Sequence, residues 1–256
     1  MIDLPDASIV VNAHREGLMV ASTLKSLYRA KAFAEKAGRT IEIVVCLDKG
    51  YDLTRAAINQ FAPAGTAVIE ASFGDLGLSR NFSVGKTCGK YIGFLDADDL
   101  FGETWIELAI RSAKCDRRPV VWHPEFNLYF GDGPRIVRHI DMEDEKYDPL
   151  WLISGNPWTA LCFADRALFE QFPYPKTDLS RGVGYEDWGW YRQVIEAGWL
   201  HKSVKGAAHA IRVKPVSLVK QTTAAGVFPV ATTLFRKMLE RRAESAYRRQ
   251  AIAPPR

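Results

Sequence analysis

The sequence has few cysteines, and they are widely spaced. Only four occur in 256 residues, and no two of them form a Cys-x-x-Cys pair. A zinc knuckle or a dithiol redox site needs closely spaced cysteines, so neither is indicated. Cys46 and Cys162 lie inside apolar runs, where a free thiol packs as a small hydrophobic group. This usage is typical of a reducing compartment, and we expect a cytoplasmic protein.

Long apolar runs are also missing. No stretch approaches the roughly 20 apolar residues that a membrane-spanning helix needs. The first residues, Met1–Asp6, lack the basic region followed by an apolar stretch that marks a secretory leader, so no signal peptide is expected.

The chain carries little net charge. Its formal value is only +4, so the molecule as a whole is not a polyanion binder, and no nucleic-acid partner is expected. Hydrophobic residues make up 47% and charged residues 25%, which excludes a disordered or fibrous chain. The length allows one large domain or two small ones.

The positive excess is concentrated near the C-terminus. Thr232–Gln250 is predicted to be a separate basic helix, with two acidic residues against six basic ones: Arg236, Lys237, Arg241, Arg242, Arg248 and Arg249. Attraction of such a segment to an anionic bilayer is worth about 1 kcal/mol per charge. One interpretation is therefore a peripheral contact with the inner face of the membrane. The other is a packed or solvated terminal helix.

The first half of the chain alternates between two patterns. Short β-rich runs occur at Ser8–Val11, Ile41–Leu47, Thr66–Ile69, Tyr91–Leu95 and Val120–Trp122. Helical spacing lies between them: Leu24–Phe33 with a stop at Gly38, Asp52–Phe61, Leu78–Lys90 and Glu103–Cys115. This alternation predicts an α/β fold with a mostly parallel sheet flanked by helices.

The pattern changes after Pro119. Gly131–Pro134 is a turn signal between two β-rich runs and predicts a hairpin. Tyr174–Gly184 is expected to be a loop, Glu186–Ala197 a helix and His201–Val213 a late strand.

Polar residues follow three of the predicted strands. Asn12 and His14 follow the first, Asp48 follows the second, and Asp96, Asp98 and Asp99 follow the fourth. Ligands of open parallel sheets bind at the carboxyl ends of the strands, so these residues mark the expected site. Adjacent carboxylates repel one another, and a hard divalent cation with oxygen ligands offsets that repulsion.

The Asp96–Asp99 stretch admits other interpretations. An EF-hand loop would need an oxygen ligand where Leu100 stands and Gly where Phe101 stands, so it is rejected. A phosphatase with an aspartyl nucleophile usually carries its motif after the first strand rather than the fourth. A solvated turn with a helix-capping Asp remains the plain structural alternative.

Four segments follow one another along the chain: Ser8–Glu16 (SIVVNAHRE), Gly77–Asn81 (GLSRN), Gly89–Asp99 (GKYIGFLDADD) and Glu186–Trp188 (EDW). In this order they resemble the motifs of family 2 glycosyltransferases. The resemblance spans residues 7–213 and implies a GT-A (Rossmann-like) fold, to which the predicted basic helix adds a C-terminal helical tail. It also implies inverting, non-processive transfer of a sugar from a nucleotide-sugar donor, here expected to be a UDP-sugar, to a saccharide or a lipid-linked saccharide.

The resemblance assigns the donor side of the site. Asp96 would hold the donor ribose, and Asp98 would bind Mn²⁺ or Mg²⁺. Asp48 would help to hold the nucleoside, although the family often has two adjacent acids where this chain has Leu47-Asp48-Lys49. Arg80 would reach the diphosphate or base, since a guanidinium suits phosphate geometry. Asn12 and His14 would border the donor.

The acceptor side follows from the Glu-Asp motif. Asp187 would be the general base that takes the acceptor's proton, and Glu186 would orient the acceptor. The structural alternative is that both acids only favour the helix N-terminus. Trp188 would offer a ring face to a sugar, or would pack in the core. His209 would be a third metal ligand, or a structural histidine in an apolar strand.

These assignments divide the chain. Residues 1–220 form the expected glycosyltransferase domain, with residues 1–118 as its nucleotide-sugar half and 119–220 as its acceptor half. Residues 221–256 form the basic helical extension. Two alternatives remain open: a catalytically inactive nucleotide- or carbohydrate-binding module, and a nucleotidyltransferase. The latter usually has a Gly-rich basic loop after its first strand, whereas Asn12–Gly17 contains one Gly and one Arg.

Overall fold

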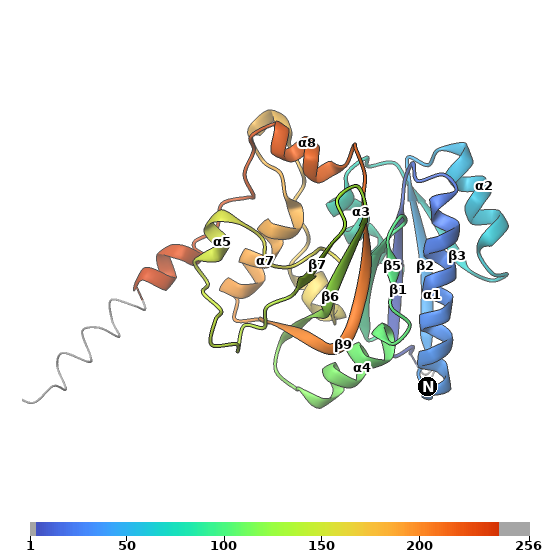
Figure 1. Ribbon diagram of the computed structural model, residues 1–256, viewed down its shortest axis with the longest axis horizontal. Coiled ribbons are helices and arrows are strands. Elements are labelled where there is room, and N and C mark those ends of the chain that lie inside the picture. Colours follow the sequence, from blue (N-terminus) through green and yellow to red (C-terminus); the bar gives the residue numbers. More distant parts are fainter. Residues whose placement is uncertain (1–3, 241–256) are drawn as a thin grey trace, which may run out of the picture.

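The computed structural model describes residues 4–240 (Figure 1). Its first half alternates strands and helices as expected: β1 (Ala7–Ala13), α1 (Met19–Lys36), β2 (Ile41–Asp48), α2 (Asp52–Phe61), β3 (Ala67–Ala71), α3 (Leu76–Val84) and β4 (Tyr91–Asp96). The second half contains β5 (Leu100–Phe101), α4 (Trp105–Cys115), β6 (Val120–Gly131), β7 (Arg135–Arg138), α5 (Trp151–Ser154), β8 (Phe163–Asp165), α6 (Arg166–Gln171), a 3₁₀ turn Leu179–Arg181, α7 (Glu186–Glu196), β9 (Leu200–Val213) and α8 (Leu218–Ala224).

The nine strands found in residues 4–240 belong to one sheet, in the order β3-β2-β1-β4-β8-β6-β9-β5, with β7 added on β6. The ladders β3–β2–β1–β4 and β6–β9 are parallel, and the short strands β5, β7 and β8 pair antiparallel. Three residues separate β4 from β5, yet β5 pairs with β9 near the other end of the strand order. The sheet therefore curls, and Asp96–Leu100 bridges its two parallel parts.

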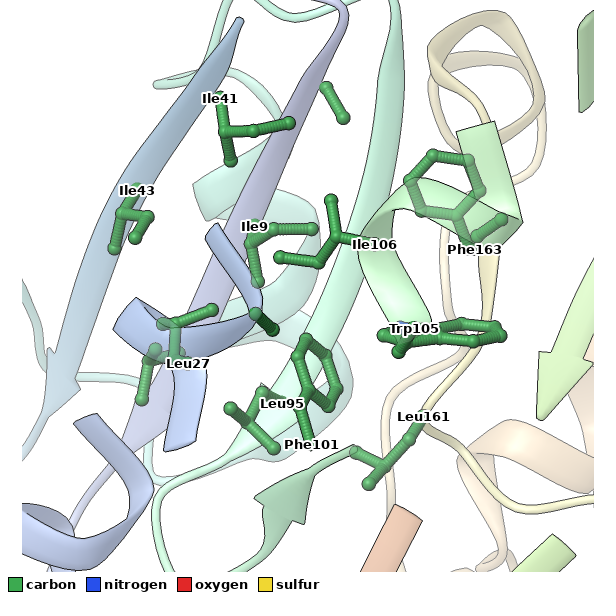
Figure 2. Close-up of a cluster of buried hydrophobic side chains, with 14 of the residues drawn as sticks. Ile9, Leu27, Ile41, Ile43, Leu95, Phe101, Trp105, Ile106, Leu161 and Phe163 are labelled. Atoms are coloured by element: carbon green, nitrogen blue, oxygen red, sulfur yellow. The ribbon is translucent and has the colours of Figure 1, made fainter. Parts of the chain in front are cut away.

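Alternation along β1 builds a core on each face of the sheet. Ile9 and Val11 face the cluster formed with α1, α2 and α4, which includes Leu27, Trp105 and Ile106 (Figure 2). Val10 faces the other cluster, formed with α3, α6 and α7. A strand buried on both faces is what a continuous apolar run such as Ser8–Val11 predicts.

Two expected elements differ in extent. The helix predicted over Leu78–Lys90 ends at Val84, because Gly89 passes so close to β1 that a Cβ there would meet the backbone of Ala7 and Ser8. Phe33, which the helical spacing grouped with Leu24, is 37% exposed, because the buried face of α1 runs through Leu24, Leu27, Ala30 and Ala34. The hairpin at Gly131–Pro134 is confirmed as β6–β7.

The start of the C-terminal tail packs against the domain. Residues 234–240 are helical, Leu234 is buried, and Lys237 pairs with Glu196 of α7 at 2.6 Å. The remaining basic positions of the predicted tail helix lie outside the described residues. Within residues 4–240, no helix has the length and apolar character needed to cross a membrane.

Candidate functional site

The polar strand ends expected from the sequence do meet. In the parallel register, Asn12 of β1 stands between Cys46 of β2 and Asp96 of β4. The Asn12 amide Nδ2 lies 3.5 Å from Oδ1 of Asp96. The carboxyl ends of β1, β2 and β4 therefore form one edge, and the acids after β4 lie on it.

The Asp96–Leu100 bridge brings this edge against the end of β9. Oδ1 of Asp99 accepts a 2.7 Å hydrogen bond from the backbone N–H of Arg212, and Asp98 forms an ion pair with Lys214. Burial, together with the charges of Asp96 and Asp98, raises the pKa of Asp99 well above its usual value. The alternative that Asp99 caps a helix is wrong, because β5 follows it and α4 begins only at Trp105.

Arg80 lies at the centre of the site and is fully buried. Its guanidinium donates to Glu186 at 3.0 Å and to Asp96 at 3.3 Å. The rings of Phe94 and Tyr174 lie 5.7 and 5.3 Å from its Cζ. Burial acts to lower the pKa of Arg80, but the two carboxylates outweigh it and raise that pKa. The side chain is enclosed and joins Asp96 of the strand-end edge to Glu186 of α7, so Arg80 does not have the exposure that the expected contact with a diphosphate or base requires.

Glu186 and Asp187 begin α7 after a sharp turn. Tyr185 adopts a left-handed backbone conformation, with φ of 53°, and directs the first turn of the helix toward Arg80. Burial and the neighbouring Asp187 raise the pKa of Glu186 to about 7. Asp187 is partly exposed, and its Oδ2 accepts a 3.0 Å hydrogen bond from Asn156. Burial raises the pKa of Asp187, while Arg80 acts to lower it.

Asp48 and His14 lie at the same strand-end edge and are engaged with the protein. The Asp48 carboxylate accepts from the backbone N–H groups of Phe73 and Gly74 at 2.7 and 2.8 Å, and from the Ser79 hydroxyl at 2.7 Å. It thereby fixes the loop before α3. The His14 ring Nδ1 contacts the backbone carbonyl of Asp48. Both residues organise this edge, and the contact of Asp48 with a nucleoside stays a prediction.

His209 is not brought to the acids. Its ring is buried, stacks on Phe101 and meets the edge of Trp105, with ring centroids 4.7 Å apart in each case. Burial lowers its pKa well below the usual value. The strand pairing sets His209 opposite Phe101, whereas Arg212 faces Asp99. His209 is therefore a core histidine in this structure and not the metal ligand that we expected.

Trp188 is also a core residue. It is buried, its Nε1 donates to the carbonyl of Leu152 at 3.0 Å, and Arg192 covers its ring. Trp190 is fully buried as well. Neither ring presents a free face to a sugar, so the expected acceptor contact of Trp188 is not supported.

A divalent cation would find one suitable protein ligand here. Among residues 4–240, no three His, Cys, Asp or Glu side chains form a group that could hold a metal. Asp98 offers hard carboxylate oxygen at the site's edge, which suits Mg²⁺ or Mn²⁺. Mg²⁺ characteristically binds through one or two carboxylates together with substrate phosphates and water, so Asp98 fits a cation that arrives with a diphosphate.

Three contributors to the site were not expected from the sequence: Asn156, Arg212 and Lys214. Asn156 lies in an irregular loop, and nothing in its surroundings marks it. Arg212 and Lys214 could have been found, because they stand at the carboxyl end of a predicted strand and the strand-end rule applies to every parallel strand.

A separate surface hollow of about 530 Å³ lies away from these acids. It borders α4 and the beginning of β9, and its lining includes Arg118 and Lys202. Both cations are paired with Asp116 and Glu143. These two cations of the hollow are therefore already engaged by acids of the protein itself.

We expect Arg80→Met to lower the free energy of unfolding by about 3–5 kcal/mol at pH 8, because it leaves buried carboxylates without their counter-ion. The loss should be smaller at pH 5.5. Glu186, whose pKa is already about 7, takes up a proton in the folded state as the pH falls, and this removes part of the uncompensated charge. Urea unfolding at both pH values measures the effect.

The matched control is Arg39→Met, which breaks a single ion pair with Glu107 at 2.7 Å on the α1–α4 side. That pair is partly exposed, and we expect a loss of about 1 kcal/mol or less at either pH. Equal losses in the two variants would contradict a central role for Arg80.

The fold and part of the sequence match known proteins. The family model described as glycosyl transferase family 2 matches residues 8–172, which is more than half of the chain. No curated protein sequence matches the chain significantly.

Similar solved structures include residues 1–349 of TarS from S. aureus, with a TM-score of 0.60 and 16% identity over 81% of this chain and 60% of that one. The chain thus spans about 60% of the length of that fragment. The mannosyltransferase PcManGT from Pyrobaculum calidifontis, in complex with GDP-Man and Mn²⁺, has a TM-score of 0.59 and 14% identity, over 93% of this chain and 69% of that one. GalNAc-T7 with UDP, GalNAc and Mn²⁺ has a TM-score of 0.60 and 16% identity, over 84% of this chain and 45% of that one.

These identities support the fold alone, whereas the family model rests on the sequence. Both agree with the meeting of strand-end acids and the Glu-Asp pair described above. The chain has the GT-A fold and belongs to glycosyl transferase family 2.

Proposed function

We propose that this protein transfers a sugar from a nucleotide-sugar donor to an acceptor hydroxyl with inversion at the anomeric carbon. The observation that carries the proposal is the Arg80 bridge, since it holds Asp96 of the donor edge beside Glu186, the neighbour of Asp187. Donor and acceptor acids are thereby held in one site, as a direct displacement requires.

The donor is proposed to be a UDP-sugar. TarS has been solved with UDP-GlcNAc and GalNAc-T7 with UDP, whereas PcManGT was solved with GDP-Man. The protein uses one oxygen of the Asp96 carboxylate for these contacts. Arg80 and Asn12 both contact Oδ1, which leaves Oδ2 for a ribose hydroxyl. The acceptor is proposed to be a saccharide, free or lipid-linked.

Asp187 is proposed as the general base. As the acceptor oxygen bonds to the anomeric carbon, the bond from that carbon to the diphosphate oxygen breaks, and the acceptor proton passes to the Asp187 carboxylate. Asn156 donates to Oδ2 of Asp187 and orients it. Glu186 is turned toward Arg80, so its proposed part is to position the base rather than to contact the reacting atoms.

Asp98 is the proposed protein ligand for Mn²⁺ or Mg²⁺. A bound divalent cation supplies Lewis-acid stabilisation of the departing diphosphate, which is worth several kcal/mol. The protein's contribution is the position of Asp98, fixed by the turn after β4 and by the contacts of that turn with β9.

We expect uridine diphosphate with Mn²⁺ to raise the melting temperature of the protein and to do so much less with a chelator. Ligand binding to the native state adds RT ln(1 + [L]/Kd) to its stability. Thermal unfolding with uridine, guanosine, cytidine and thymidine diphosphates names the donor class, and Asp98→Asn should remove the metal-dependent part of the shift.

Asp132→Asn is the control, because Asp132 is an exposed acid in the β6–β7 turn. The folded wild-type protein showing no shift with any of the four nucleotides would overturn the donor assignment. If Asp98→Asn showed the same metal-dependent shift in melting temperature as the wild type, only the assignment of Asp98 as metal ligand would be overturned.

We expect Asp187→Asn to lower the rate of transfer by about 10²–10⁴-fold while nucleotide binding stays unchanged, because the base acts on the acceptor. Release of nucleoside diphosphate from a panel of nucleotide-sugars with candidate saccharides measures the rate. Unchanged turnover in Asp187→Asn would rule out its role as base, and nucleotide binding without any turnover in the wild type would instead favour the binding-module alternative.

Loss of the Asn156 hydrogen bond should change the pH dependence. Asn156 stabilises the ionised form of Asp187, so Asn156→Ala should raise the pKa of the base and move the acidic limb of the rate profile to higher pH. Asn59→Ala, on the exposed face of α2, should leave the profile in place, and an unmoved limb in Asn156→Ala would contradict a positioning role.

A further inference from the structure

The acid-rich edge holds a cation of its own that the family resemblance does not assign. Lys214 follows the last residue of β9, and its ammonium pairs with Oδ2 of Asp98, the proposed metal ligand. The side chain of Asp98 is 10% exposed and that of Lys214 is 32% exposed. The pair therefore lies at the mouth of the site, where a ligand can reach it.

Two contacts fix the chain just before Lys214. The Arg212 N–H donates to Asp99, and the Arg212 Nε donates to the backbone carbonyl of Asp98 at 3.3 Å. Lys214 then leaves the sheet and is followed by the irregular residues 215–217 before α8. Its backbone origin is thus held at the acids, while its long flexible stem lets the ammonium change partners.

The surrounding charges explain why a cation stays there. Asp96, Asp98 and Glu16 all act on Lys214 electrostatically. The other cation at the centre of the site, Arg80, is taken up by Asp96 and Glu186. Arg212 reaches only the backbone carbonyl of Asp98, so among these three cations it is Lys214 that pairs with the Asp98 carboxylate.

We propose that Lys214 and a divalent cation compete for Asp98, and that Lys214, once displaced, binds the donor's diphosphate. This inference rests on the proposed function. An ammonium and a metal ion cannot both occupy Oδ2 of Asp98, because like charges at contact distance repel. A phosphate oxygen is a suitable second partner, since lysine binds phosphate as a point charge.

The exchange makes metal and donor binding interdependent. In the empty protein Lys214 blocks the metal ligand, so the cation binds weakly alone. With the donor present, the displaced ammonium gains a phosphate partner and the metal gains phosphate oxygens. Each ligand thus promotes binding of the other, and Lys214 is the donor-binding residue that couples them.

The test compares Lys214→Met with Lys220→Met. Lys220 is a half-exposed lysine of α8 that pairs with Asp132 instead. Electron paramagnetic resonance of free Mn²⁺ measures the affinity of the protein for Mn²⁺ alone, and calorimetry measures that for uridine diphosphate at saturating Mn²⁺. We expect Lys214→Met to bind Mn²⁺ alone roughly tenfold more tightly and the nucleotide roughly tenfold more weakly. Lys220→Met should change neither affinity.

Wild-type protein supplies a measurement that does not depend on the variant's folding. Acetylation of Lys214 by an N-hydroxysuccinimide ester, followed by mass spectrometry, should become faster with Mn²⁺ alone, because the ammonium leaves Asp98. It should become slower when uridine diphosphate is added with Mn²⁺. Reactivity that Mn²⁺ leaves unchanged would overturn the competition.

The outcomes separate this inference from the function it rests on. Nucleotide binding with Mn²⁺ in the wild type, together with an unchanged or weaker Mn²⁺ affinity in Lys214→Met, overturns the role of Lys214 alone. Failure of every nucleoside diphosphate to bind the folded wild type overturns the proposed function. Tighter Mn²⁺ binding in Lys214→Met would still support the competition at Asp98 in that case.

Discussion

The buried Arg80 guanidinium is the charge on which the arrangement of the site depends. Asp96, Glu186 and Asp187 lie close together, with Glu186 buried and the other two partly exposed, and a cation offsets the repulsion among the three carboxylates. Arg80 contacts two of them and acts electrostatically on the third. Because Arg80 is fully buried, the rings of Phe94 and Tyr174 help to fix its position, and the geometry of both paired acids follows from the core.

The curl of the sheet brings a second cation, Lys214, to the site. The bridge after β4 is too short to leave the edge, and β5 must pair with β9, so the end of β9 is drawn against Asp98 and Asp99. Lys214 balances the outer acids as Arg80 balances the inner ones. The two cations differ in freedom: Arg80 is enclosed by the rings of Phe94 and Tyr174, while Lys214 reaches its acid from an irregular segment at the surface.

The backbone of the site could be predicted because strand ends are encoded locally. Apolar runs end where polar residues begin, and parallel pairing then brings Asn12 and Asp96 to one edge. The partners of individual side chains were harder to predict, because they depend on which face of a helix or strand packs against the core. Arg80 shares the inward face of α3 with Gly77 and Val84, and His209 has the same orientation in β9 as the buried Ala207. Both faces can be seen in the sequence, yet a charged or ionisable residue on an inward face suggests a ligand contact before it suggests a core position.

The contacts that join the halves of the chain have no local signal. Arg80 from the expected nucleotide half binds Glu186 from the expected acceptor half, and Lys214 from the latter binds Asp98 from the former. Each pair crosses the division at residue 118. A donor acid and an acceptor acid are therefore balanced by charges from opposite halves, so a shift of one half relative to the other would unbalance both acids together. The site can hold its carboxylates only while the whole sheet is assembled.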